Sequence, residues 1–173
     1  MAINVKRVGH VGIYASDVER SLQFYTEVLG CTITNVGHGP DGKARSAFLR
    51  FEDKHHDFVI FQAPEGLAPA STEGGTRVVQ QIAFEVDSRD DFLRALTHVR
   101  AKGVEIVNGP LVHGFEGDGK NFNGSGSRSF YFLDPDGNRL EIYTDMMRVP
   151  NGEQFPRAEY ADLIETLQAN AMR

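Results

Sequence analysis

The feature that most constrains the fold of this chain is an internal repeat of one order of secondary structure. Residues 8–15 are typical of a strand, residues 19–29 carry apolar side chains at three- and four-residue steps, and three short β-like segments follow up to residue 61. The same order of strand, helix and strands starts again at residue 78. The sequence therefore predicts two copies of a β-α-β-β-β unit, offset by roughly 70 to 80 residues.

Each predicted copy has one helix, which can cover only one face of its sheet, so the other face is closed by the partner copy or left as a cleft. The predicted fold class is α+β, with two βαβββ modules forming a cupped mixed β-sheet around a central cleft. The modules span about residues 6–62 and 77–145, with a linker at 63–76 that is rich in Pro, Gly, Ser and Ala. Residues 1–148 are expected to form a single domain, and residues 149–173 a C-terminal helical tail.

The composition favours a small-molecule site over a polymer-binding surface. The net charge is −6 and no run of Lys or Arg occurs, which argues against nucleic-acid binding. No apolar run approaches the length of about 20 residues that a membrane span needs, and the N-terminus lacks a secretory apolar segment, so a cytoplasmic protein is expected. Cys31 is the single cysteine, so any metal must be held by imidazole, carboxylate or amide oxygen.

The last predicted hairpin carries a carboxylate within a largely apolar sequence. The apolar runs at 130–133 and 139–143 are separated by Asp-Pro-Asp-Gly-Asn at 134–138, which has the residues of a tight turn. Glu141 points to the opposite face from its two aliphatic neighbours, and an ionised Glu on a covered face needs a cation or a hydrogen-bond donor. Tyr131 alternates with two phenylalanines and is expected on the same face as Glu141.

These features resemble a known superfamily. The paired modules, His10 in the first strand and Phe-Leu-Asp-Pro-Asp-Gly-Asn-Arg-Leu-Glu-Ile-Tyr at 132–143 look like the vicinal oxygen chelate proteins, which include glyoxalases, fosfomycin and bleomycin resistance proteins and extradiol dioxygenases. The resemblance runs from about Arg7 to Thr144. Within the superfamily, the sequence is most similar to the catalytic half of type I extradiol dioxygenases such as catechol 2,3-dioxygenase.

The resemblance implies roles for five residues. It makes His10 and Glu141 metal ligands, and His56, which opens a strand with the aspartate that follows it, an acid and base. It makes His113, in a Gly-Pro-x-x-His-Gly segment, a residue that orients the substrate, and Tyr131 a residue that bonds a substrate oxygen. Without the resemblance, His10 could equally be a core histidine, and His56 and His113 exposed surface histidines.

A sixth position departs from the dioxygenase pattern. Those enzymes have a second metal-binding histidine where this chain has Gln81, so the implied metal ligands are His10, Gln81 and Glu141. The resemblance implies Fe(II) as the cofactor. Because an amide oxygen is a poorer donor than imidazole for a first-row metal, another divalent metal or none are the alternatives. Gln81 is otherwise a hydrogen-bonding residue in a site without metal. The carboxylate ligand expected of a glyoxalase falls on Val59, which cannot coordinate a metal.

The implied function is a metal-dependent extradiol-type dioxygenase, an oxidoreductase that cleaves a small catechol-like aromatic with O2 and forms a homodimer. Gln81 keeps two alternatives open: a non-catalytic or metal-free small-molecule binding protein of the resistance type, and a glyoxalase-like lyase or isomerase. Candidates for the apolar walls of the cleft are Phe48, Phe58 and Phe115. Asp134 and Asp136 are interpreted as turn formers without a chemical role.

Overall fold

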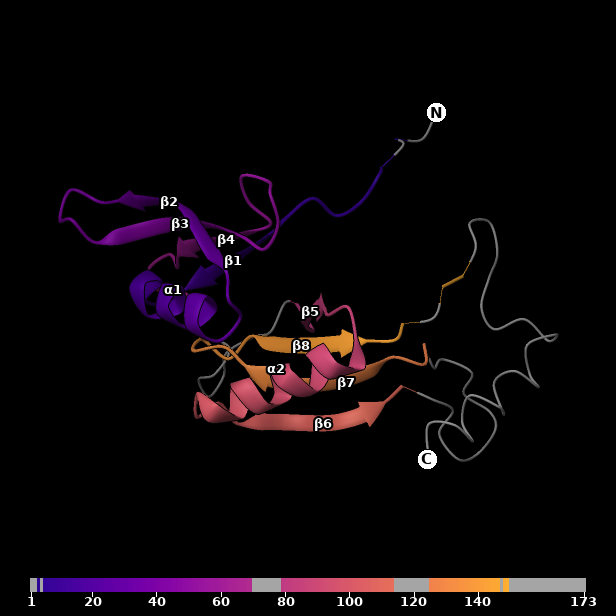
Figure 1. Cartoon of the computed structure of the whole chain (residues 1–173). Helices are drawn as coiled ribbons and strands as arrows, with labels where there is room; N and C mark the ends of the chain where they lie inside the picture. The colour runs from indigo at the N-terminus through magenta and orange to yellow at the C-terminus, as the bar shows by residue number, and fades with distance from the viewer. Residues whose placement is uncertain (1–2, 4, 70–78, 114–124, 147, 150–173) are drawn as a thin grey trace, which may run out of the picture. The chain divides into compact units, whose positions relative to one another are not determined.

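Each half of the described chain is built from one helix laid on a four-stranded mixed sheet (Figure 1). This computed structural model describes residues 3, 5–69, 79–113, 125–146 and 148–149. The chain divides into a first unit, Met1–Gln80 with Asp134–Asn138, and a second unit, Gln81–Leu133 with Arg139–Arg173. The two mixed sheets and few helices confirm the predicted α+β class. The linker lies partly, and the C-terminal helix wholly, outside the described residues, and the domain boundaries stay predictions.

The first unit has the strand order β1-β4-β3-β2, in which β1 and β4 are parallel and the other neighbours antiparallel. Its elements are β1 (Val11–Ala15), α1 (Val18–Glu27), β2 (Thr32–His38), β3 (Ala44–Arg50) and β4 (Phe58–Gln62). Helix α1 begins after Asp17, because the Asp17 side chain accepts a hydrogen bond from the backbone N–H of Arg20 at 3.0 Å. It ends before Gly30, whose φ of 73° favours glycine.

The core of the first unit lies between α1 and one face of its sheet. The ring of Tyr25 on α1 lies 4.7 Å from that of Phe58, and Leu49 and Ile60 beside them are fully buried. The prediction that Phe58 forms a wall of a cleft is therefore wrong. Its position in β4 places it on the same face as Ile60, which α1 covers.

The second unit repeats this arrangement with the order β5-β8-β7-β6, in which β5 and β8 are parallel. Its elements are β5 (Ile82–Glu85), α2 (Arg89–Ala101), β6 (Ile106–Val112), β7 (Arg128–Leu133) and β8 (Arg139–Thr144). Residues 104–107 are typical of a short strand, but β6 extends further, through Gly109-Pro110. Since β6 is an edge strand with an irregular register between Asn108 and Leu111, it tolerates a proline that cannot donate a hydrogen bond.

The register of the two sheets shows which positions of the two halves are equivalent. Gly12 of β1 pairs with Val59, and Ala83 of β5 pairs with Glu141, so Val59 and Glu141 occupy equivalent places. His10 and Gln81 each stand one residue before the opening strand. The repeat therefore gives two pairs of equivalent positions: Val59 with Glu141, and His10 with Gln81.

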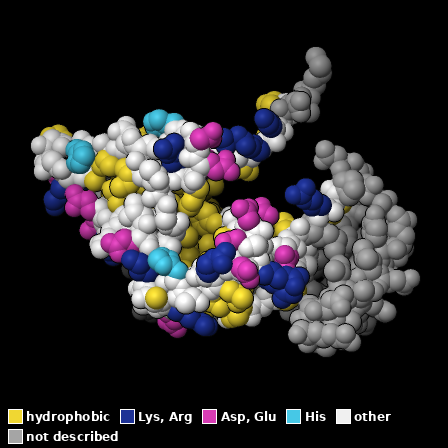
Figure 2. Space-filling view, in the orientation of Figure 1, with side chains coloured by type: hydrophobic (Ala, Val, Ile, Leu, Met, Phe, Trp, Pro, Cys, Tyr) yellow, Lys and Arg dark blue, Asp and Glu magenta, His cyan; other side chains and the backbone are white. Residues whose placement is uncertain are grey.

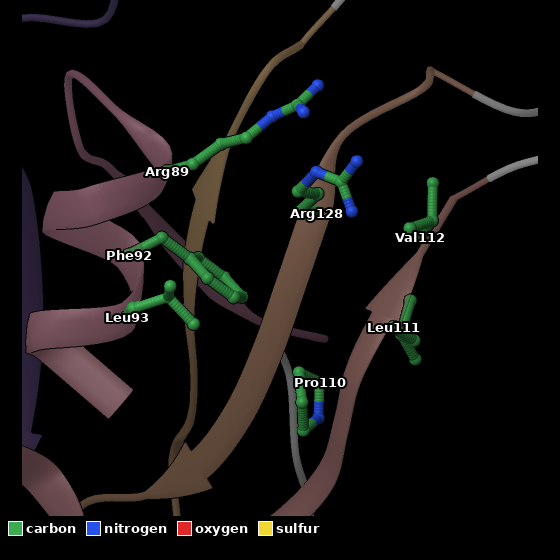
Figure 3. A pocket seen from close by; sticks show the side chains of 7 residues that line it. All are labelled: Arg89, Phe92, Leu93, Pro110, Leu111, Val112 and Arg128. Carbon is green, nitrogen blue, oxygen red and sulfur yellow. The ribbon is translucent and has the colours of Figure 1, made fainter. Parts of the chain in front are cut away.

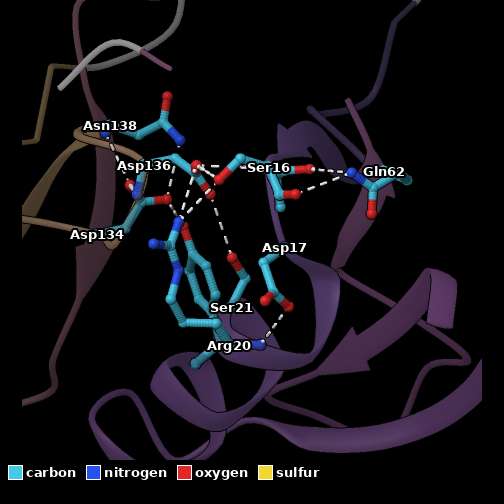
Figure 4. Close-up of polar contacts among 10 residues, drawn as sticks. Ser16, Asp17, Arg20, Ser21, Gln62, Asp134, Asp136 and Asn138 are labelled. Carbon is cyan, nitrogen blue, oxygen red and sulfur yellow. Dashed lines mark hydrogen bonds and ion pairs between the residues drawn. The ribbon is translucent and has the colours of Figure 1, made fainter. Parts of the chain in front are cut away.

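The turn at 134–138 joins β7 to β8 but belongs to the first unit, where both of its aspartates are buried (Figure 4). Asp136 Oδ1 accepts hydrogen bonds from the backbone N–H of Ser16 at 3.1 Å, from the Ser16 hydroxyl at 2.5 Å and from the Arg20 guanidinium at 3.1 Å. The hydroxyl of Ser21 lies 3.4 Å from Asp136 Oδ2. Asp136 is therefore an anion held at the N-terminus of α1, where the helix dipole favours it.

Asp134 closes the turn and also contacts α1. Its Oδ2 accepts from the Tyr25 hydroxyl at 2.9 Å and from the Asn138 amide at 2.8 Å, while Oδ1 accepts from the backbone N–H groups of Asp136 and Asn138. The interpretation of the two aspartates as turn formers alone is therefore incomplete. Turn propensity could not show it, because the donors lie more than 100 residues away in the sequence.

Charges of both signs share the protein surface. Figure 2 shows basic and acidic side chains interspersed over the face in view, with hydrophobic side chains between them. In the described part of the chain, neither helix has the length and apolar character to cross a membrane.

Candidate functional site

The second sheet has an apolar face and a polar face. Alternate residues of β7 and β8 turn toward α2, where the ring of Phe130 lies 5.3 Å from that of Phe92. The residues between them, including Tyr131 and Glu141, turn the other way. Tyr131 and Glu141 are direct partners in the β7–β8 ladder, as the alternation of the sequence predicted.

Glu141 is only 5% exposed and has a donor for each carboxylate oxygen. The hydroxyl of Tyr131 donates to Oε1 at 2.9 Å, and the amide nitrogen of Gln81 donates to Oε2 at 2.5 Å. The Nε2 atom of His113 lies 3.6 Å from Oε1. These donors offset the loss of hydration that burial of an ionised carboxylate costs.

The direction of the hydrogen bonds defines the tautomer of His113. The Tyr131 hydroxyl has one proton, which it donates to Glu141, so its oxygen accepts from Nε2–H of His113 at 2.6 Å. Burial, and then the hydrogen bond and charge of Glu141, raise the pKa of Tyr131. The phenol therefore remains a protonated donor at neutral pH, in a chain that runs from His113 through Tyr131 to Glu141.

Two polar atoms beside these hydrogen-bonded side chains have no hydrogen-bond partner among the described residues. They are Oγ of Ser129, two residues before Tyr131, and Nε of Arg139, two residues before Glu141. The guanidinium carbon of Arg139 also lies 4.0 Å from the centre of the Tyr131 ring. Buried polar atoms are normally paired, so these two indicate a face that receives water or a ligand.

In the first unit, three histidines and a phenylalanine form a ring cluster. The ring centroid of His10 lies 4.8 Å from that of His56, and Nδ1 of His55 lies 2.9 Å from Nδ1 of His56. One of these two nitrogens donates to the other. The ring of Phe48 lies 5.2 Å from that of His56, so Phe48 provides an apolar contact for the imidazoles.

The structure thus gathers the predicted site residues into two groups. The second unit brings together Gln81, His113, Tyr131 and Glu141. The first unit brings together His10 and His56. That the six residues form one site, and the roles assigned to them, stay predictions. Phe115 lies outside the described residues. Ser129 and Arg139 were missed, although their spacing of two from Tyr131 and Glu141 places them on the same face.

Residues 7–142 match the Glyoxalase/Bleomycin resistance protein/Dioxygenase superfamily. The chain belongs to this superfamily. It is 27% identical over 145 residues to biphenyl-2,3-diol 1,2-dioxygenase 2 of Rhodococcus globerulus. This match covers 84% of this chain and 66% of that protein. It is 30% identical over 152 residues to lactoylglutathione lyase GLX1 of Arabidopsis thaliana. This match covers 87% of this chain and 47% of that protein.

Solved structures of superfamily members share the fold. A glyoxalase/dioxygenase from Nostoc punctiforme has a TM-score of 0.57 and 25% sequence identity, with 82% of this chain and 92% of that chain covered. The chain spans less than two thirds of the length of the first three curated relatives: 66%, 38% and 66%. These similarities include both dioxygenases and a lyase, so membership of the superfamily alone does not select one reaction.

The predicted ligands His10, Gln81 and Glu141 fit a divalent metal in kind, since they offer imidazole, amide and carboxylate donors. Within the described residues, no three His, Cys, Asp or Glu side chains gather closely enough to hold an ion between them. Gln81 also presents its amide N–H, not its oxygen, to Glu141. A metal at this position requires the amide to turn and Glu141 to exchange its donors for the cation.

Proposed function

We propose that this chain is an extradiol-type dioxygenase that cleaves a catechol-like aromatic with O2, using a divalent metal, Fe(II) in the first instance, held by His10, Gln81 and Glu141. The observation that supports it is the hydrogen-bonded chain from His113 through Tyr131 to the buried Glu141, flanked by the unpartnered Arg139 Nε. Such a face suits a ligand with adjacent oxygens. The name of the Rhodococcus relative gives a vicinal aromatic diol as its substrate.

Each residue of the polar face has a distinct task in this proposal. The Tyr131 phenol, kept protonated by its raised pKa, donates to a substrate oxygen when that oxygen replaces a carboxylate oxygen as its acceptor. His113, which donates to the phenol oxygen, strengthens this donor. The guanidinium of Arg139 favours negative charge on the bound diol. Bound Fe(II) would supply Lewis acidity and electron transfer between diol and O2.

His56 is the proposed acid and base. It takes the proton of a diol hydroxyl and later returns a proton as the O–O bond is cleaved, a task that suits an imidazole side chain. The Nδ1 contact with His55 at 2.9 Å and the ring of Phe48 hold the imidazole in place. We therefore expect His56→Asn to lower kcat far more than it raises the KM for the diol.

A second candidate is a metal-free protein that binds a small molecule without turnover. The specific observation in its favour is the 2.5 Å hydrogen bond from Gln81 to Glu141, which offsets the charge of the carboxylate without a cation. This candidate predicts ligand binding that survives chelator treatment. The dioxygenase predicts that chelation abolishes both ring cleavage and binding of the diol.

The test is metal content by elemental analysis after anaerobic purification, with and without added Fe(II), followed by oxygen uptake with a panel of catechols that includes 2,3-dihydroxybiphenyl. The variants are His10→Ala and Gln81→His, with His38→Ala, an exposed histidine at the end of β2, as the matched control. We expect one metal ion per chain, lost in His10→Ala and retained in His38→Ala, and tighter binding in Gln81→His. Absence of metal from wild type and Gln81→His alike would refute the dioxygenase and leave the metal-free candidate.

A further inference from the structure

The second unit contains a pocket on the α2 side of its sheet, away from the polar face. Its volume is about 420 Å³, within the range of small-molecule sites. It is lined by Arg89, Phe92 and Leu93 of α2, by Pro110, Leu111 and Val112 of β6, and by Arg128 of β7. Figure 3 shows Phe92 and Leu93 pointing from the helix toward the strands, with both arginine side chains at the same end of the pocket. The site is thus apolar along its length and cationic at one end.

The cationic end is a cluster of two arginines and one aspartate. The Nε atoms of Arg89 and Arg128 both contact Oδ2 of Asp145, at 2.6 and 3.1 Å. Two guanidinium groups share this one carboxylate, so the cluster has a net charge of +1. Among the described residues, both arginines use Nε for this ion pair, and no acidic side chain pairs with their terminal Nη atoms. Asp145 is held at φ 61°, a left-handed conformation that costs a residue other than glycine free energy. The side chain of Arg128 is only 25% exposed, so its charge is partly shielded from water.

The apolar part of the pocket gives the second half of the specificity. Leu93 is 57% exposed although it lines a concave apolar surface, so a ligand that covers it removes hydrocarbon from water. A hydrophilic anion would gain the arginines but not this contact, and a hydrocarbon would gain the contact but not the arginines. A ligand with one acid group on an apolar body gains both.

We propose that this pocket binds a small amphipathic organic acid, with its carboxylate on the Nη edges of Arg89 and Arg128 and its aromatic or branched aliphatic body against Phe92, Leu93 and Val112. Planar guanidinium groups suit this role because they bind carboxylates through two hydrogen bonds. The inference is independent of the proposed dioxygenase, since the pocket lining does not include Gln81, His113, Tyr131 or Glu141.

The experiment is fluorescence titration of the full-length chain with 2-naphthoate, compared with the uncharged 2-naphthalenemethanol. The chain has no tryptophan, so the emission of the probe is measured over a low protein background. The variants are Arg128→Gln and Leu93→Gln. The control is Arg94→Gln, which removes a 68%-exposed arginine of the same helix that pairs with Asp91 and does not line the pocket.

We expect naphthoate to bind about ten-fold more tightly than the alcohol, and Arg128→Gln to abolish that preference. Leu93→Gln, at an exposed position where misfolding is not expected, should weaken the binding of both probes by several-fold. Arg94→Gln should change the affinity for neither probe. Equal binding of acid and alcohol, or an unchanged acid preference in Arg128→Gln, would overturn the proposal. So would sedimentation that shows a dimer dissociated by Leu93→Gln, because a second copy would then occupy this surface.

Discussion

The buried hydrogen bond from Tyr25 to Asp134 gives the sharpest test of how the turn at 134–138 is held. Tyr25 is fully buried and Asp134 is 5% exposed, and the phenol oxygen lies 2.9 Å from the carboxylate. Tyr25→Phe removes only the hydroxyl and keeps the ring packed on Phe58. Removing one partner of a hydrogen bond to a buried charged group costs about 1.5–3 kcal/mol. Asp134 keeps three other donors, so we expect a loss of about 2 kcal/mol.

The pH dependence of this loss follows from the pKa of Asp134. Burial raises the pKa of the carboxyl, and the Tyr25 hydroxyl lowers it again in part. In Tyr25→Phe the folded-state pKa rises further, so the variant loses additional stability as the pH rises through that pKa. Below the ordinary value of 3.8 the carboxyl is neutral in both folded and unfolded chains, and this part of the loss disappears. The deficit is therefore largest at pH 7 and shrinks toward about pH 4.

The assay is urea denaturation at several pH values, with thermal unfolding as a second measurement. A loss of about 2 kcal/mol corresponds to a fall in Tm of about 4–8 °C for a chain of this length. The control is Tyr14→Phe, since Tyr14 is 55% exposed and should change stability by less than about 0.5 kcal/mol. If Tyr25→Phe is as stable as Tyr14→Phe, or if its deficit grows as the pH falls, the contact does not hold the turn as argued.

Two further predictions concern Cys31 and Gly109. Burial raises the pKa of the Cys31 thiol from 9.0 to about 12, so the stability that this raised pKa contributes is present below pH 9 and lost between pH 9 and 12. Stability of wild type should fall relative to Cys31→Ala there, by up to about 1.4 kcal/mol per pH unit, as urea midpoints will show. Gly109 has φ 88° and a Cβ there would lie 2.7 Å from the Ser129 carbonyl oxygen, so Gly109→Ala should cost at least about 2 kcal/mol more than Gly42→Ala. Gly42 has φ 77° but nothing within 4 Å, and equal urea midpoints for the two variants would contradict the role of the close contact.

Local patterns in the sequence were sufficient for the elements and for part of the site. The helical spacing predicted α1, and Ser16 or Asp17 was expected to begin it. Asp87 or Ser88 was expected to begin the second helix. The structure begins the two helices with Asp17 and Ser88. The alternation of apolar and polar residues placed Tyr131 beside Glu141. These predictions succeeded because they depend on neighbours within a few residues.

Ser129 and Arg139 could have been found from their spacing, but the other failures depend on contacts between distant segments. Phe58 was misplaced because a run of four apolar residues does not say which face a helix covers. The chemistry of Asp134 and Asp136 was missed because their donors lie on α1 and at its start. The contact between His113 and Tyr131 joins residues 18 positions apart, at the end of an edge strand and in a central one, and no local pattern predicts it.

Gln81 shows why a ligand set inferred from residue types needs the direction of its hydrogen bonds. The sequence posed Glu141 as a buried carboxylate that needs a cation or a donor, and a side-chain amide can serve either need. The amide oxygen could bind a metal together with Glu141. The amide N–H instead donates to Glu141 and offsets its charge without a metal. The structure has the second arrangement, with Tyr131 on the other carboxylate oxygen. A metal must therefore compete with two hydrogen bonds, whereas a histidine at position 81 that coordinates through a lone pair has no amide N–H to lose. The metal affinity of wild type relative to Gln81→His consequently measures the strength of this competition.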